Sequence, residues 1–330
     1  MLILAKTALA MMLGFIFAII CGLIFIPFLK KINFRQHISE TIGEKHKKKE
    51  GTPTMGGIIF IFPVLITLFL LYLRGSIEIN HNLIIVLLVF LSYAVLGFID
   101  DWLKVRYHNN QGLRISTKFL LQMLIALIFF YIFMKNGGEP IIDITSLHIA
   151  IPMGWTFGLF ILFLLVGSSN AVNITDGLDG LCGGLSMIAF VALGIITWNT
   201  TWMEGYQEVA IFCFVLVGAL LGFLLFNTHP ARVFMGDLGS LSLGATMAAI
   251  CIVTRHELSL AVIGGVFVIE TLSSMIQIVA IRKFHRKVFK MAPLHHHFEQ
   301  LGWGETDIVK MFYVVGLLLA MAAITYGVWI

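Results

Sequence analysis

The chain has 330 residues, of which 59% are hydrophobic and only 12% charged, and its formal net charge is +4 at pH 7. So little polar surface cannot cover a water-soluble globule of this size. The composition excludes a soluble protein and predicts a single all-α, polytopic membrane domain over residues 1–330.

Apolar runs of roughly 17 to 25 residues, the length that crosses a bilayer, follow one another along the chain. We expect about ten transmembrane helices, near 3–29, 55–73, 83–99, 119–134, 154–170, 181–198, 209–226, 241–254, 259–280 and 309–329. Between the fourth and fifth runs, residues 135–153 contain Gly137-Gly138, Pro140 and an alternating segment at 141–144. This pattern is typical of a small β-hairpin.

The basic residues divide unequally between the two sides that these runs define. The loops 30–54, 100–118, 227–240 and 281–310 hold 18 of the 22 lysines and arginines. Positive residues accumulate on the cytoplasmic side of membrane proteins. We therefore expect these loops in the cytoplasm, and both termini and the hairpin outside.

Acidic residues recur where apolar runs end on the predicted cytoplasmic side. Asp100-Asp101 follows the third run, and adjacent side chains on a helix point about 100° apart. One of them could bind a ligand or act as a base while the other orients it. A solvated helix end is the alternative, but a negative charge at a helix C-terminus is mildly unfavourable, which favours a functional role.

The segment 170–181 is the richest in polar residues. Asn173, Asp176 and Asp179 are spaced three apart and would share a broad face if the segment is helical. The glycines between 177 and 184 indicate instead a close backbone approach to a ligand or to another helix. Helix packing explains the glycines but not two aspartates among them.

Asp237 lies between two glycines at the start of the eighth run. Backbone N–H groups at a helix N-terminus favour an anion or a carboxylate there, and an aspartate that only caps the helix is the alternative. Several carboxylates on one side of a bilayer suggest a divalent-cation site, and hence phosphate chemistry facing the cytoplasm.

Three consecutive histidines, His295, His296 and His297, lie beside a basic stretch in the last cytoplasmic loop. Successive side chains on a helix cannot all converge on one zinc ion. Donation to phosphate oxygens fits the neighbouring basic residues better, and a solvated loop is the alternative.

Five segments, in order along the whole chain, resemble the polyprenyl-phosphate N-acetylhexosamine-1-phosphate transferases. They are 52–57, 100–101, 173–181, 234–241 and 293–299. The histidine segment is similar to that of the phospho-N-acetylmuramoyl-pentapeptide transferases rather than that of relatives that use UDP-N-acetylglucosamine. Each segment alone is a weak signal, whereas their order and the matching topology are specific.

The resemblance implies transfer of phospho-MurNAc-pentapeptide from UDP-MurNAc-pentapeptide to undecaprenyl phosphate, giving lipid I and UMP. This is the first membrane step of peptidoglycan synthesis, on which cell-wall growth, cell shape and division depend. One phosphoanhydride replaces another, so no ATP is needed, and the sequence contains no Walker-type phosphate loop. The resemblance further implies Mg²⁺ as cofactor, a bacterial plasma-membrane location, contact with membrane lipids, a homodimer, and no nucleic-acid partner.

By the same resemblance, Asp237 is the principal Mg²⁺ ligand, and Asp100, Asp101 and Asp237 are catalytic, with Asp100 orienting or deprotonating the lipid phosphate. The implied substrate contacts are Asn173, Asp176, Asp179, Asn227 and Phe234 on the uridine side, Lys104 and Lys118 on the diphosphate, and His295, His296 and His297 on phosphate oxygens. Phe234 would stack on the base. The lipid tail would lie against the ninth run, where Gly264-Gly265 permits a bend, and Glu270 in that run has no assigned role.

Two other functions stay open. A UDP-N-acetylglucosamine:undecaprenyl-phosphate transferase would share every segment except the histidine one, and the UDP-sugar that releases UMP separates the two. A cation-coupled transporter could also use Asp100, Glu270 and broken helices. Its acids, however, should line a path across the membrane.

Overall fold

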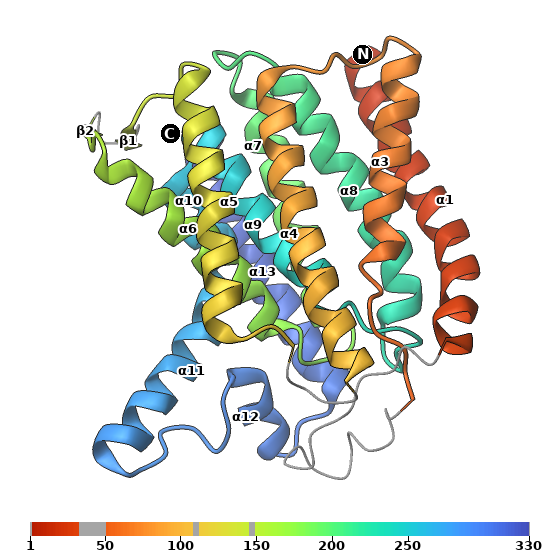
Figure 1. Cartoon of the computed structure of the whole chain (residues 1–330), viewed down its shortest axis with the longest axis vertical. Helices are drawn as coiled ribbons and strands as arrows, with labels where there is room; N and C mark the ends of the chain where they lie inside the picture. The colour runs from red at the N-terminus through yellow and green to blue at the C-terminus, as the bar shows by residue number, and fades with distance from the viewer. Residues whose placement is uncertain (1, 33–50, 108–111, 145–148, 330) are drawn as a thin grey trace.

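The computed structural model describes residues 2–32, 51–107, 112–144 and 149–329 (Figure 1). Its helices are α1 (Leu2–Lys31), α3 (Ile58–Leu73), α4 (His81–Arg106), α5 (Ile115–Lys135), α6 (Thr156–Thr175), α7 (Leu181–Asn199), α8 (Tyr206–Asn227), α9 (Asp237–Val253), α10 (Glu257–Ile263), α11 (Gly265–Phe284), α12 (Leu294–Gln300) and α13 (Glu305–Trp329). The strands β1 (Ile141–Ile144) and β2 (Ile149–Pro152) pair antiparallel and form the expected hairpin.

The all-α, polytopic membrane class is confirmed. Eight of the described helices are long and apolar enough to cross a bilayer. Two more, α3 and α9, are apolar but shorter, with 16 and 17 residues. Together these helices account for the ten expected apolar runs.

The ninth run is divided at Gly264 into α10 and α11, at the glycine pair where the sequence indicated a bend. Two successive glycines have low helix propensity and lack the Cβ that would stiffen the turn. From this break α11 extends away from the bundle toward the end that carries α12 (Figure 1).

Helix α9 forms the centre of the bundle, and every one of its residues is buried. It contacts α3, α4, α6 and α7. Small residues allow this close packing, and serines on α9 and on α6 satisfy carbonyl groups of the facing helix that water cannot reach. Ser242 Oγ donates to the carbonyl of Phe90 at 2.8 Å, and Ser168 Oγ donates to that of Gly244 at 2.7 Å.

The two ends of the bundle carry different features (Figure 1). The termini and the hairpin lie at one end, and α12 lies at the other. The described segments with the candidate carboxylates also lie toward the α12 end. Most of the basic loop 30–54 falls outside the described residues. The predicted common side for both termini therefore agrees with the fold, while the cytoplasmic assignment of the α12 end stays a prediction.

Candidate active site

Asp237 is the first residue of α9. The residue that caps the helix is Gly236, whose φ of +76° lies in the left-handed region that favours glycine. A Cβ at Gly236 would overlap the carboxylate of Asp101. The alternative that Asp237 only caps the helix is therefore wrong: its side chain lies in the first turn, where the helix dipole favours a negative charge.

Phe234 holds the segment before α9 through its backbone. Its N–H donates to the carbonyl of Pro53 and its own carbonyl accepts from Gly56 N–H, both at 2.8 Å. The Phe234 ring is partly buried. These bonds join segments 52–57 and 234–241, two of the five that the sequence singled out, next to Asp237.

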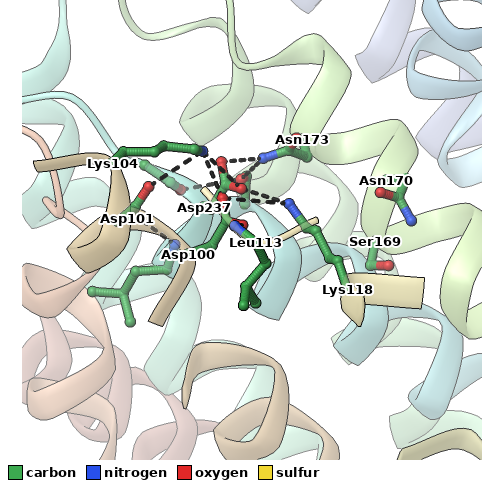
Figure 2. A network of polar contacts seen from close by, with 12 residues as sticks. Asp100, Asp101, Lys104, Leu113, Lys118, Ser169, Asn170, Asn173 and Asp237 are labelled. Carbon is green, nitrogen blue, oxygen red and sulfur yellow. Dashed lines mark hydrogen bonds and ion pairs between the residues drawn. The ribbon is translucent and has the colours of Figure 1, made fainter. Parts of the chain in front are cut away.

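Asp100, Asp101 and Asp237 converge at this point (Figure 2). Each offers an oxygen within 4.8 Å of the other two, and all three residues are buried. Asp101 Oδ2 accepts from Leu238 N–H at 3.1 Å, which ties the end of α4 to the start of α9. Asp100 Oδ1 accepts from Leu113 N–H at 2.8 Å. The adjacent acids thus face one site but bind different backbone groups.

Two lysines offset this negative charge. Lys104 Nζ lies 2.7 Å from Asp100 Oδ2 and 3.1 Å from Asp237 Oδ2. Lys118 Nζ lies 2.6 Å from Asp237 Oδ2 (Figure 2). Buried charges are tolerated when they are paired in this way. Three carboxylates against two ammonium groups leave one formal negative charge.

Asn173, in the last turn of α6, belongs to the same cluster. Its Nδ2 donates to Asp237 Oδ1 and to Ser240 Oγ, both at 2.8 Å. Both carboxylate oxygens of Asp237 therefore accept hydrogen bonds. Oδ1 accepts from the amide of Asn173, and Oδ2 accepts from the ammonium groups of Lys104 and Lys118. Ser240 was not anticipated as a partner, although it lies in the same glycine-flanked segment.

The donor set fits a hard divalent cation. Carboxylate oxygens are the ligands that Mg²⁺ prefers, usually with one or two carboxylates and several waters. Asp100, Asp101 and Asp237 would hold such an ion, because they are close together and their charge exceeds that of the lysines. Cysteine and histidine, which favour zinc, are absent from this described cluster.

Asp176 and Asp179 do not share a helix face, because α6 ends at Thr175 and a turn follows. Desolvation, together with the negative charges of Asp237 and Asp101, raises the pKa of Asp176 to about 7. Asp176 therefore responds to the charge of the carboxylate cluster. The helical interpretation is therefore wrong beyond Thr175, where the glycines lie in a turn.

Asp179 points to a second group of polar residues. Its Oδ2 lies 3.0 Å from His229 Nδ1 and accepts from Ala231 N–H at 3.1 Å. Glu305 Oε1 accepts from the Asp179 N–H at 2.8 Å. Neither His229 nor Glu305 was anticipated, because each lies alone in its sequence segment.

Asn227 supports the same turn from the end of α8. Its Oδ1 accepts from Gly180 N–H at 3.2 Å, and its Nδ2 donates to the carbonyl of Val233 at 2.9 Å. The side chain is buried. Its observed contacts are with backbone groups on both sides of the candidate uridine region.

The three histidines of α12 point in different directions, as expected for a helix. His295 is fully buried, and its Nδ1 lies 2.9 Å from Glu270 Oε2. His296 Nδ1 lies 2.6 Å from Glu299 Oε2. His297 Nδ1 accepts from Lys290 N–H at 3.1 Å.

A cavity of about 680 Å³ opens beside the carboxylates. Asp100, Asp237 and both lysines line its polar end, whereas Ile115 and Phe119 of α5 line its apolar part. Gln122, buried in α5, reaches Ser169 Oγ at 3.3 Å. This polar patch of Gln122 and Ser169 was not predicted from the sequence. A glutamine inside an apolar run was the signal that could have indicated it.

Comparisons with known proteins agree on one family. The glycosyl transferase family 4 model matches residues 83–255, and the phospho-N-acetylmuramoyl-pentapeptide-transferase signature 1 matches 49–61. Among the similar curated proteins, three examples carry the name phospho-N-acetylmuramoyl-pentapeptide-transferase. The one from Geobacillus kaustophilus is 47% identical over 97% of both chains, the one from Geobacillus thermodenitrificans 46% over 97% of this chain and 98% of its own, and the one from Bacillus subtilis 44% over 97% of both.

Proposed function

This chain belongs to the phospho-N-acetylmuramoyl-pentapeptide-transferase family, and we propose that it catalyses the reaction that gives the family its name. It transfers phospho-MurNAc-pentapeptide from UDP-MurNAc-pentapeptide to undecaprenyl phosphate in the bacterial plasma membrane. The products are lipid I and UMP, in the first membrane step of peptidoglycan synthesis.

One observation supports this reaction above the others: three buried carboxylates and two lysines lie together at one end of the bundle, beside a cavity with an apolar side. An oxygen of the lipid phosphate attacks the phosphorus that carries the sugar, and the bond from that phosphorus to the UMP oxygen breaks. Both reactants are anions, so the site must offset their repulsion. Lys104 and Lys118 would do so by turning from the carboxylates to phosphate oxygens.

Asp237, with Asp100 and Asp101 beside it, would hold Mg²⁺. The bound ion would neutralise charge on the diphosphate and so make it a better acceptor of the attacking oxygen. Asp100 lines the polar end of the cavity, and we assign it the task of orienting the lipid phosphate and taking up a proton when that phosphate is protonated. Asp101, bound to the start of α9, keeps the cluster assembled.

The nucleotide would lie over the turn after α6. Asp176, Asp179 and Asn227 would frame it, and Phe234 would stack on the base. Asn173 orients Asp237 through the 2.8 Å hydrogen bond. His296 and His297 would contact phosphate oxygens from α12. The lipid tail would enter along Ile115 and Phe119, where α5 exposes apolar side chains, and continue toward α11.

The test uses protein purified into lipid nanodiscs with UDP-MurNAc-pentapeptide, undecaprenyl phosphate and Mg²⁺. We expect release of UMP and formation of lipid I, and loss of both when a chelator is added. UDP-N-acetylglucosamine serves as the competing donor. UMP release from that sugar alone would replace the proposed function with the N-acetylglucosamine transfer. Ion uptake by the same protein in sealed proteoliposomes, without UMP release, would indicate a transporter.

A further inference from the structure

Glu270 is a carboxyl group inside a membrane helix, and no lysine or arginine in the described part of the chain pairs with it. It lies in α11, its side chain is fully buried, and among the described residues its ion-pair partner is His295. An ionisable side chain at this depth is costly, and such residues are retained where they serve a function. The proposed chemistry of the carboxylate cluster does not use Glu270.

The contacts between Glu270 and His295 fix the position of the histidine. Glu270 Oε1 accepts from the His295 backbone N–H at 3.1 Å. Glu270 Oε2 lies 2.9 Å from the ring Nδ1. A carboxylate can only accept, so the ring Nδ1 that faces it carries a proton. Burial also lowers the pKa of His295. One carboxylate thus holds the backbone, the ring orientation and the tautomer.

The opposite edge of the same ring meets the turn that follows α6. His295 Nε2 is buried and has no hydrogen-bond partner among the residues that the structure describes. A Cβ at Gly177 would overlap this atom, so the ring edge packs directly against the Gly177 backbone. Gly177 follows Asp176 and precedes Asp179 by two residues. A movement of the ring would therefore press on the backbone that joins the two candidate uridine residues.

We propose that Glu270 is a positioning residue: acting through His295, it holds the turn 176–179 in the conformation that binds the donor nucleotide. This inference rests on the proposed function for the identity of the donor. It also assigns His295 a supporting task, in place of the direct phosphate contact expected from the sequence. A glutamine keeps one acceptor oxygen for the backbone N–H but turns an NH₂ group toward Nδ1. The ring would then have to move its proton to Nε2, which packs against the Gly177 backbone, or change its orientation.

The first test is kinetic and compares Glu270→Gln with Glu257→Gln. Glu257 is also a buried carboxyl in an apolar helix, but it lies in α10, toward the end of the bundle opposite α12. Glu270→Gln should raise KM for UDP-MurNAc-pentapeptide by about 10-fold or more, the usual effect of removing a residue that orients a ligand-site histidine. KM for undecaprenyl phosphate should stay within about twofold, and Glu257→Gln should change neither value.

The second test does not need activity. Amide hydrogen exchange, followed by mass spectrometry of the nanodisc-embedded protein, should be faster at 176–180 in Glu270→Gln than in the parent and in Glu257→Gln. If the parent releases no UMP but this exchange difference is present, the proposed function fails while the positioning role stands. Unchanged exchange at 176–180 overturns the positioning role, and so does an unchanged donor KM in an active parent.

A third comparison guards against a general folding defect in Glu270→Gln. Gly177→Ala should also raise the donor KM, because its Cβ displaces the His295 ring. His295→Asn shortens the side chain and removes this overlap. The double variant should then lose no more donor affinity than His295→Asn alone, since both changes act on one contact. Additive losses would show that Gly177 and His295 act independently, and would overturn the proposal.

Discussion

At the scale of single residues, the contacts of Asp237 bear on the order of the chemical steps. Its Oδ2 is shared by Lys104 and Lys118, and its Oδ1 accepts from Asn173. Such charge-assisted hydrogen bonds lower the basicity and nucleophilicity of a carboxylate. The monoester of the lipid phosphate is the better nucleophile, which favours direct attack over an aspartyl-phosphosugar intermediate.

Direct attack predicts that UMP appears only when the lipid is present. Enzyme freed of lipid phosphate, incubated with UDP-MurNAc-pentapeptide and Mg²⁺, should release less than one UMP per active site, and labelled UMP should not exchange into the donor. A stoichiometric burst accompanied by exchange would indicate a covalent intermediate. Mass spectrometry of the lipid extract serves as the control for co-purified undecaprenyl phosphate.

Replacing the central carboxylate should abolish turnover without unfolding the chain. Asp237→Asn keeps the shape but removes the charge, so turnover should fall by about 10²-fold or more. Asp100→Asn and Asp101→Asn should also reduce turnover. Asp143→Asn is the matched control, because Asp143 lies on the hairpin at the other end. UMP release measures turnover, and elution as a single peak in size-exclusion chromatography checks folding; near-parental turnover of Asp237→Asn would contradict the site.

Sequence reasoning located residues better than it located their partners. Asp100, Asp101 and Asp237 lie where apolar runs begin or end, and that position alone predicts a shared membrane face. The pairing of Glu270 with His295 could not be found in this way, because the two are 25 residues apart and only the fold brings them together. Asp179 was placed on the wrong face, because the turn after Thr175 interrupts the helical spacing.

At the scale of elements, the contact between α4 and α9 holds the site. Gly97 of α4 packs against the backbone of Asp237, and a Cβ there would overlap the Asp237 carbonyl. The absence of a side chain at Gly97 therefore sets how closely the helix with Asp100 and Asp101 approaches the helix with Asp237. Most helix boundaries were predictable to within about five residues, but α4 continues to Arg106, past the predicted end at residue 99. The close approach of α4 and α9 was not visible in the hydropathy pattern.

Separating these two helices should impair both stability and turnover. Gly97→Ala should lower stability by about 1–3 kcal/mol, the usual cost of overpacking, and reduce UMP release. Gly167→Ala in α6 is the control, since nothing lies within 4 Å of the added Cβ and alanine favours the helix by about 1 kcal/mol. Thermal unfolding in detergent measures both variants. If the Gly97→Ala protein is as stable and active as the parent, α4 and α9 can separate enough to admit a methyl group without loss of stability or turnover.

At the scale of the whole molecule, the fold explains why the polar chemistry collects at one end. α9 is enclosed by other helices, so its N-terminus delivers a carboxylate to the inside of the bundle rather than to lipid. The outer helices α1, α5, α11 and α13 expose apolar side chains, as a lipid-facing layer requires. Hydropathy predicted this layer, but not which helix is central, because every run is apolar. The homodimer stays a prediction.

The orientation of the bundle can be tested with single cysteines, because the four native cysteines, all within the described residues, are buried. Thr201 is exposed in the α7–α8 connection, at the end with the termini, and Gln300 is exposed at the end of α12. If the basic loops are cytoplasmic, a membrane-impermeant maleimide should label Thr201→Cys in intact spheroplasts and Gln300→Cys only after permeabilisation. The parent protein measures background labelling. Labelling of Gln300→Cys in intact spheroplasts would place the carboxylate site outside the cell, away from the cytoplasmic pool of nucleotide-linked sugars, and would contradict both the orientation and the proposed donor.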